Sequence, residues 1–130
     1  MPNMSNNLFH PLPNASDGER FEQLLARPGC RIERIVSRGQ ASPPGFWYEQ
    51  DWDEWVVLLA GQATLGFDAS PGEGAWTLNL AAGDYCFIPA GRRHRVESTD
   101  PGGATIWLAV HIGEHAAAEN SPFEFRQSAP

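Results

Sequence analysis

The sequence lacks a long hydrophobic run, an excess of basic residues and a dense set of cysteines. Without an apolar stretch of about 20 residues, no transmembrane helix is expected. The first residues also carry neither the basic nor the apolar region of a signal peptide. The formal net charge of -7 argues against nucleic acid or an anionic membrane as the main partner, because both require a basic surface. We therefore expect a cytoplasmic protein without nucleic-acid or membrane partners.

Cys30 and Cys86 are the two cysteines of the chain, and they do not form a CxxC motif. Without a secretory context, this favours reduced thiols that pack as small apolar side chains over a disulfide. Several catalytic signatures are also missing, because the sequence contains no G-x-S-x-G, no P-loop and no GxGxxG after a strand. The serine hydrolase, nucleotide-binding and cysteine-nucleophile classes therefore have no support.

The length and composition favour one domain. With 130 residues and 42% hydrophobic content, the chain can form one core but is too short for two ordinary domains. Residues 1–15 are rich in Asn and Pro and predict a flexible N-terminal arm. The single domain is expected over residues 16–130.

The start of this domain has the pattern of a short helix. Ser16 and Glu19 match a capping box, and apolar residues follow at helical spacing. The pattern predicts a helix over about Asp17–Ala26 that ends at Pro28-Gly29.

After this point the sequence is typical of short strands separated by turns rich in Gly, Pro and Asp. Strand length and β-branched or aromatic content are found over residues 30–38, 54–60, 63–67, 75–80, 84–89, 94–98, 104–112 and 123–126. The residues around Gly61 predict a tight hairpin between two of these strands. This pattern predicts an all-β fold, an antiparallel sandwich or barrel.

Two segments carry spaced motifs. In the first, Gly45 precedes a crowded acidic stretch, and Glu54 stands with six residues between it and Gly61. In the second, four spaced positions agree with one pattern, namely Gly83, Pro89, Gly91 and His94. Proline stops the ladder of one strand and glycine lets the chain reverse, so His94 is delivered to the start of a new strand.

Together these segments resemble the two signature motifs of the cupin superfamily, over about residues 30–112 with core motifs at 45–98. The resemblance implies a jelly-roll β-barrel, preceded here by the short helix. Family members hold a divalent metal at the barrel mouth through a His-x-His pair, a Glu and a second-motif His. For this chain, the resemblance implies Glu54 and His94 as metal ligands. Ser98 replaces the Asn that ends the second motif.

The first motif departs from the family pattern, because no histidine occupies the His-x-His positions. Three registers are possible, and they place the pair on Tyr48 and Gln50, on Trp47 and Glu49, or on Asp51 and Asp53. We prefer the first, since both side chains then share a face and offer an oxygen. Gln50 is thus the expected third metal ligand, and Tyr48 is expected to bind the ligand or act as an acid.

An amide and a phenol are weaker ligands than two imidazoles. The expected cofactor is a divalent ion such as Mn, Fe, Ni or Zn. The oxygen-rich set suits Mn, Fe(II), Mg or Ca better than Zn or Ni, and the site could equally stay empty.

His111 offers a substitute ligand, because it is in phase with Trp107 and Ala109 on a late strand. If that face lines the barrel, His111 joins His94 and Glu54 in a two-His-one-carboxylate set. We expect the core on the opposite face instead, which consists of Ile106, Leu108, Val110 and Ile112.

A basic cluster stands out in this acidic chain. We expect Arg93 and Arg95 to pair with acidic neighbours across strands. Arg92 is in phase with His94 and is the candidate to bind an anionic small molecule.

Two functions remain open. The first is a metal-binding cupin that acts on a small organic molecule, either anionic or neutral, for which the resemblance implies oxygenase or isomerase chemistry. The second is a non-catalytic, metal-free barrel that binds a small molecule or a partner chain. Cupins commonly dimerise, so we expect a homodimer formed through the early strand and the arm.

Overall fold

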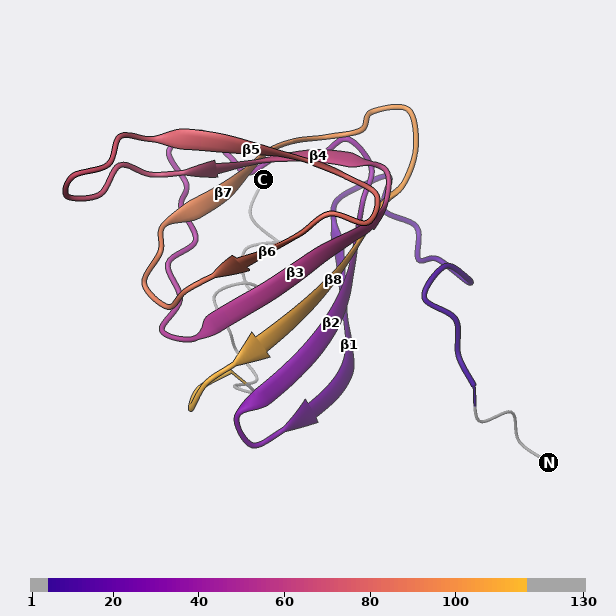
Figure 1. Ribbon diagram of the computed structural model, residues 1–130. Helices are drawn as coiled ribbons and strands as arrows, with labels where there is room; N and C mark the ends of the chain where they lie inside the picture. Colours follow the sequence, from indigo (N-terminus) through magenta and orange to yellow (C-terminus); the bar gives the residue numbers. More distant parts are fainter. Residues whose placement is uncertain (1–4, 117–130) are drawn as a thin grey trace.

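The computed structural model describes residues 5–116, which form two antiparallel sheets that face each other (Figure 1). One sheet has five strands in the order β1-β2-β8-β3-β6, and the other has three in the order β5-β4-β7. The bounds are β1 Arg20–Arg27, β2 Cys30–Ser37, β3 Asp53–Ala60, β4 Gln62–Phe67, β5 Trp76–Ala81, β6 Tyr85–Ile88, β7 His94–Thr99 and β8 Thr105–Ile112. The all-β antiparallel prediction is confirmed.

Seven of the predicted strands correspond to β2 through β8, with ends that differ by at most one residue. The eighth, at residues 123–126, lies outside the described residues. No helix in the described part of the chain is long and apolar enough to span a membrane.

The predicted helix over Asp17–Ala26 is wrong, because β1 occupies Arg20–Arg27. Pro28-Gly29 does not end a helix but forms the two-residue turn between β1 and β2, where Arg27 pairs with Cys30. Pairing of β1 with β2 therefore outweighs the local helical pattern. An isolated helix of about ten residues is marginally stable in water, whereas β1 joins a sheet of five strands.

The predicted hairpin at Gly61 is also wrong. β3 ends at Ala60 in the five-stranded sheet, whereas β4 starts at Gln62 in the three-stranded sheet, so the two strands are not paired. Gly61 has a φ of 86°, and a Cβ on it would lie 2.8 Å from the Cα of Thr105. Glycine is needed here because the chain turns sharply between sheets against the backbone of β8.

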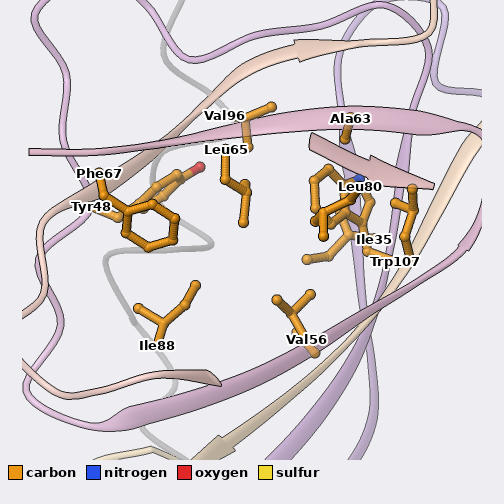
Figure 2. Packing of buried hydrophobic residues seen from close by; sticks show 12 residues of the cluster. Ile35, Tyr48, Val56, Ala63, Leu65, Phe67, Leu80, Ile88, Val96 and Trp107 are labelled. Carbon is orange, nitrogen blue, oxygen red and sulfur yellow. The ribbon is translucent and has the colours of Figure 1, made fainter. Parts of the chain in front are cut away.

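The core lies between the sheets. Leu65 and Val96 of the three-stranded sheet face Val56 and Ile88 of the five-stranded sheet across the interior (Figure 2). The buried members of the core are Ile35, Tyr48, Val56, Leu58, Ala63, Leu65, Phe67, Leu80, Ile88, Val96, Trp107 and Ala109. Both sheets thus contribute alternate residues to one interior, as expected for two packed antiparallel sheets.

Candidate metal and ligand site

The two sequence motifs meet at one place in the barrel. The backbone of Tyr48 exchanges hydrogen bonds with that of His94, at 2.7 and 3.1 Å, and the N–H of Gly91 donates to the carbonyl of Gln50 at 2.7 Å. The irregular chain before β3 is therefore fixed to the start of β7. Glu54, near the start of β3, lies beside them.

Glu54 and His94 form a buried pair, with only 2% and 3% of each residue exposed. Nε2 of His94 is 3.8 Å from Oε1 of Glu54. Nδ1 of His94 lies 2.9 Å from the carbonyl oxygen of Arg92. Since a carbonyl only accepts, Nδ1 carries the proton, and in the neutral ring Nε2 presents a lone pair.

The third member of the site is Gln50, which is 4% exposed. Its amide nitrogen donates to Oε1 of Glu54 at 3.3 Å. Its amide oxygen and Nε2 of His94 are both buried without a hydrogen-bond partner among the described residues. Buried polar atoms are normally satisfied, so two unsatisfied acceptors beside a carboxylate point to a cation or donor that belongs there.

Tyr48 completes the cluster. It is 4% exposed, and its ring stacks on His94 with 5.4 Å between centroids. The structure thus brings together Tyr48, Gln50, Glu54 and His94, the residues of the preferred register.

The acidic residues of the other two registers have different contacts. Glu49 faces Arg93, and Oδ2 of Asp51 lies 2.9 Å from Nδ1 of His115. Oδ1 of Asp53 accepts a hydrogen bond from the N–H of Ala90. These carboxylates bind neighbouring loops rather than the buried cluster.

His111 lies on the interior face, so the prediction that the opposite face of β8 is the core is wrong. Trp107, Ala109 and His111 are at most 3% exposed, whereas Ile112 is 49% exposed. The indole N–H of Trp52 donates to Nδ1 of His111 at 2.8 Å, so Nε2 donates to Oε1 of Glu33 at 2.7 Å. Both ring nitrogens are occupied, and His111 does not join Glu54 and His94 as a ligand.

The basic cluster is engaged at the surface. Arg93 pairs with Asp68, which follows β4, as expected, whereas Arg95 pairs with Glu97 of its own strand rather than across strands. Arg92 pairs with Glu73 at 2.5 Å and lies over the rings of Phe67 and Trp76. Its predicted contact with an anionic ligand therefore has no geometric support.

A cavity of about 20 Å³ adjoins the buried cluster. Its described lining consists of Glu19, Phe21, Ile35, Tyr48, Glu54, Val56, Leu65, Ile88, His94, Val96 and Trp107. This space holds about one water-sized occupant. The described lining contains two carboxylates and no arginine, so an anion is disfavoured inside it.

Glu19 is the lining residue that sequence reasoning missed, because it was assigned to a helix cap. The indole N–H of Trp107 donates to Oγ of Ser37, which in turn donates to Glu19 at 2.5 Å. Burial raises the pKa of Glu19, and the hydrogen bond from Ser37 opposes this shift. A signal in the sequence could have revealed this position. Glu19 and Phe21 alternate opposite Ser37 and Ile35 across a Pro-Gly turn, which is the pattern of a hairpin.

Both cysteines are free thiols, as predicted. Burial, together with the nearby charge of Glu54, raises the pKa of Cys86 to about 11. Because the thiolate is the reactive form, Cys86 is an inert packing residue rather than a nucleophile.

Comparison with known proteins identifies the family. The chain is 44% identical to a Ralstonia eutropha JMP134 protein described as a "putative mannose-6-phosphate isomerase", with a TM-score of 0.77 over 85% of this chain and 98% of that one. A Methanocaldococcus jannaschii cupin with a double-stranded β-helix fold matches at 15% identity, over 80% and 88% of the two chains, with a TM-score of 0.60. A cupin domain from Bordetella pertussis Tohama I matches at 17% identity, over 74% and 94%, with a TM-score of 0.55.

The chain belongs to the cupin superfamily. No protein-family model and no curated protein matches the sequence. Within residues 5–116, no three His, Cys, Asp or Glu side chains gather as a metal-binding group. Glu54 and His94 supply two such groups, and the amide of Gln50 supplies a third donor, so the set fits a weakly held divalent ion.

Proposed function

We propose that this cupin binds a divalent metal ion between Glu54 and His94, with Gln50 as a third ligand. The observation that carries the proposal is Nε2 of His94, which is buried 3.8 Å from Oε1 of Glu54 and has no hydrogen-bond partner among the described residues. Metal bonds to His nitrogen and carboxylate oxygen are about 2.1 Å long, so one ion can span a gap below about 4.2 Å. The backbone carbonyl that orients the other ring nitrogen is the usual support of a metal-binding histidine.

The donor set selects the kind of ion. One imidazole, one carboxylate and one amide oxygen suit Mn²⁺ or Fe²⁺ better than Zn²⁺ or Ni²⁺. Such an ion would polarise an oxygen of a bound organic molecule. Tyr48 stacks on His94 and lines the same cavity, which holds about one water-sized group, so it is placed to contact the oxygen that reaches the ion.

Metal content of protein purified without chelators or affinity-tag metal is the decisive measurement. We expect about one ion per chain, or uptake of Mn²⁺ or Fe²⁺ on addition, and loss of that binding in His94→Ala and Glu54→Gln. His115→Ala is the matched control, because His115 is an exposed histidine paired with Asp51 outside the cluster. A wild type that takes up none of Mn²⁺, Fe²⁺, Ni²⁺ and Zn²⁺ would exclude the metal site.

For the reaction, we propose isomerisation of a small hydroxylated molecule rather than oxygenation. The supporting observation is the description of the Ralstonia eutropha protein, which is 44% identical to this chain. Because the cavity admits only about one water-sized group and its described lining has no cationic side chain, the sugar and any phosphate on it would lie outside the cavity, with one oxygen reaching the ion.

Conversion between an aldose and a ketose, followed by NMR with phosphorylated and unphosphorylated sugars, tests this reaction. We expect turnover in metal-loaded wild type and none in His94→Ala. Turnover of neither sugar by a protein that binds metal would refute isomerisation while leaving the metal site intact.

The second candidate function is a metal-free barrel that acts as an interaction module. The specific observation in its favour is the exposure of Tyr85, Phe87 and Ile112 on the five-stranded sheet. A wild-type protein that neither contains nor takes up a metal ion would favour this second function.

A further inference from the structure

An aromatic row crosses the end of the three-stranded sheet that carries His94. Trp76 of β5 pairs with Phe67 of β4, which pairs in turn with His94 of β7. Directly paired residues of an antiparallel sheet share a face, and Phe67 belongs to the buried core. Trp76 therefore stands on the interior side of the sheet, at the same end as the candidate metal site. It is nevertheless 41% exposed, whereas Phe67 and His94 are at most 4% exposed.

The indole ring of Trp76 is held in a fixed orientation. It stacks on the ring of Phe67, with 4.3 Å between the centroids and 17° between the planes. Its N–H donates to Oε1 of Glu73 at 3.3 Å. Glu73 belongs to the hairpin loop that extends beyond β4 and β5 (Figure 1), where its backbone exchanges two hydrogen bonds with Ser70, both at 2.9 Å. A ring held in this way loses little conformational entropy when a ligand binds.

One face of this ring is open. Among the described residues, Phe67 is the ring that stacks on Trp76. The guanidinium carbon of Arg92 lies 5.5 Å from the centroid of Phe67 and 5.8 Å from that of Trp76. Because these two distances are nearly equal, Arg92 lies alongside the stacked pair and not beyond the far face of Trp76. The face of Trp76 that is turned away from Phe67 is therefore the accessible one.

The charged groups beside this open face form a neutral pair. Arg92 donates to the same oxygen of Glu73 that accepts from Trp76, at 2.5 Å. This hydrogen bond lowers the pKa of Glu73, so the side chain stays a carboxylate with lone pairs that can accept further hydrogen bonds. The guanidinium likewise has more N–H donors than this contact uses. Because the pair has no net charge, it favours a neutral ligand that both donates to the carboxylate and accepts from the guanidinium over an anion or a cation.

A sugar ring has this combination of surfaces. The C–H groups of a pyranose form an apolar face that can lie on an indole ring, and its hydroxyl groups donate and accept hydrogen bonds at the edge. We propose that Trp76, Glu73 and Arg92 form a binding site for a neutral sugar ring, which stacks on the open face of Trp76.

This sugar site is separate from the candidate metal site. Trp76 and His94 are two strands apart, which places their backbones about 10 Å from each other. Phe67 lies between them, so the open face of Trp76 is turned away from His94. Sugar binding at Trp76 therefore does not depend on a bound metal ion.

NMR of the indole N–H groups of the five tryptophans tests the site, with the Trp76 resonance assigned by its loss in Trp76→Phe. D-Glucose, D-mannose and D-galactose are titrated over roughly 1–100 mM, with and without EDTA. We expect at least one sugar to shift the Trp76 resonance with a Kd of about 1–10 mM, unchanged by EDTA. Sorbitol, which carries the hydroxyl groups of glucose without its ring, should cause no such shift.

Variants followed by saturation-transfer NMR of the sugar locate the binding. Trp76→Ala should weaken binding about tenfold or more, and Trp76→Phe should retain part of it, because a stacking ring remains. Glu73→Gln should weaken binding severalfold, since the charged partner of Arg92 is lost. The matched control is Phe87→Ala, which removes an exposed ring from β6 of the other sheet and should leave the Kd unchanged. Circular dichroism checks the fold of each variant.

Three results would overturn the sugar site. The first is a Trp76 resonance that none of the three sugars shifts. The second is a folded Trp76→Ala variant that binds sugar as well as wild type, or a response to sorbitol equal to that to glucose. The third is a shift that disappears with EDTA, because the sugar would then be held by a metal ion.

The methyl glycosides of the same sugars identify the source of the ligand. Binding of a methyl glycoside supports a site that also accepts the end of a sugar chain. Binding of the free sugar alone supports a site for monosaccharides.

Discussion

The two sheets of this cupin share one interior but present opposite surfaces to solvent. The outer surface of the three-stranded sheet carries Thr64 paired with Asn79 and Ser98, which is the polar exterior expected of an antiparallel sheet. The outer surface of the five-stranded sheet carries aliphatic and aromatic side chains at the equivalent positions. The interior side of that same sheet holds buried charges, including Arg31, Glu33 and Glu54.

This contrast separates stability from function. A sheet whose only task is to close a core keeps its outside polar and its inside apolar. The five-stranded sheet departs from that rule on both sides, and both departures have a physical cost. Its inner charges mark the candidate site and its supports, and its exposed outer side chains, Tyr85, Phe87 and Ile112, form the surface that favours the second candidate function.

The largest expected effect comes from breaking the inner charge cluster with Glu33→Ala. Glu33 forms an ion pair with Arg31, with 3.2 Å between Oε1 and Nη2, and accepts a hydrogen bond from His111 at 2.7 Å, and all three residues are fully buried. Removing one partner of a buried ion pair costs about 3–5 kcal/mol of unfolding free energy.

Glu22→Ala, which removes a carboxylate from the outer side of the same sheet, should cost only about 1 kcal/mol, since Glu22 is partly exposed. Urea unfolding of both variants measures the difference. Equal losses of unfolding free energy would show that a carboxylate on the inner side of the sheet contributes no more to stability than one on the outer side.

Val56 and Val57 give a matched pair of neighbouring residues on opposite sides of β3. Val56 is 3% exposed in the core, so Val56→Ala should destabilise the protein by about 2 kcal/mol. Val57→Ala should cost less than about 1 kcal/mol in dilute protein. Thermal unfolding of both variants measures the difference. Equal losses of unfolding free energy would show that the two valines are equally buried.

Glu19 adds a pH-dependent effect to the interior. Because burial raises its pKa above 4.5, the folded protein keeps this proton at pH values where the unfolded chain has released it. The free energy of unfolding therefore contains a term that is greatest in acid and is lost as the pH rises from the unfolded-state pKa through the folded-state pKa. Glu19→Gln cannot ionise and should lack this decline. The urea midpoints of wild type and variant, measured from about pH 4 upward, test this. Parallel pH profiles of the two proteins would contradict it.

The smallest effect concerns reactivity rather than stability. With a pKa of about 11, Cys86 should be alkylated at pH 8 roughly a hundredfold more slowly than an ordinary cysteine thiol. The rate in a Cys30→Ser variant, followed by mass spectrometry with iodoacetamide, reports on Cys86 alone. A rate equal to that of free cysteine would mean that Cys86 is neither buried nor affected by Glu54.

Sequence reasoning succeeded where neighbouring residues carry the information. The strands from β2 to β8 were predictable from β-branched and aromatic runs between turn residues, and the second motif correctly delivered His94 to the start of β7. The choice of Tyr48 and Gln50 among three registers also agrees with the contacts of the buried cluster. The acidic residues at the alternative positions, Glu49, Asp51 and Asp53, contact neighbouring loops instead. These features depend on local backbone preferences and on fixed spacing.

Sequence reasoning failed where the partner is distant. The segment Asp17–Ala26 has a helical pattern, but pairing with β2 makes it a strand and turns Glu19 toward Ser37. The residues flanking Gly61 look like a hairpin, yet their two strands join different sheets. The face of β8 could not be assigned by alternation, because both of its sides are rich in apolar residues.

The sequence by itself determined that this chain is an all-β cupin and which residue types stand at the motif positions. Spacing along the chain is sufficient for that, since glycine, proline and turn residues act on their immediate neighbours. Only the tertiary structure decided that Nε2 of His94 faces Glu54 and that His111 is held by Glu33 and Trp52. Those facts depend on which strands pair and in what register, and register is set by the whole sheet.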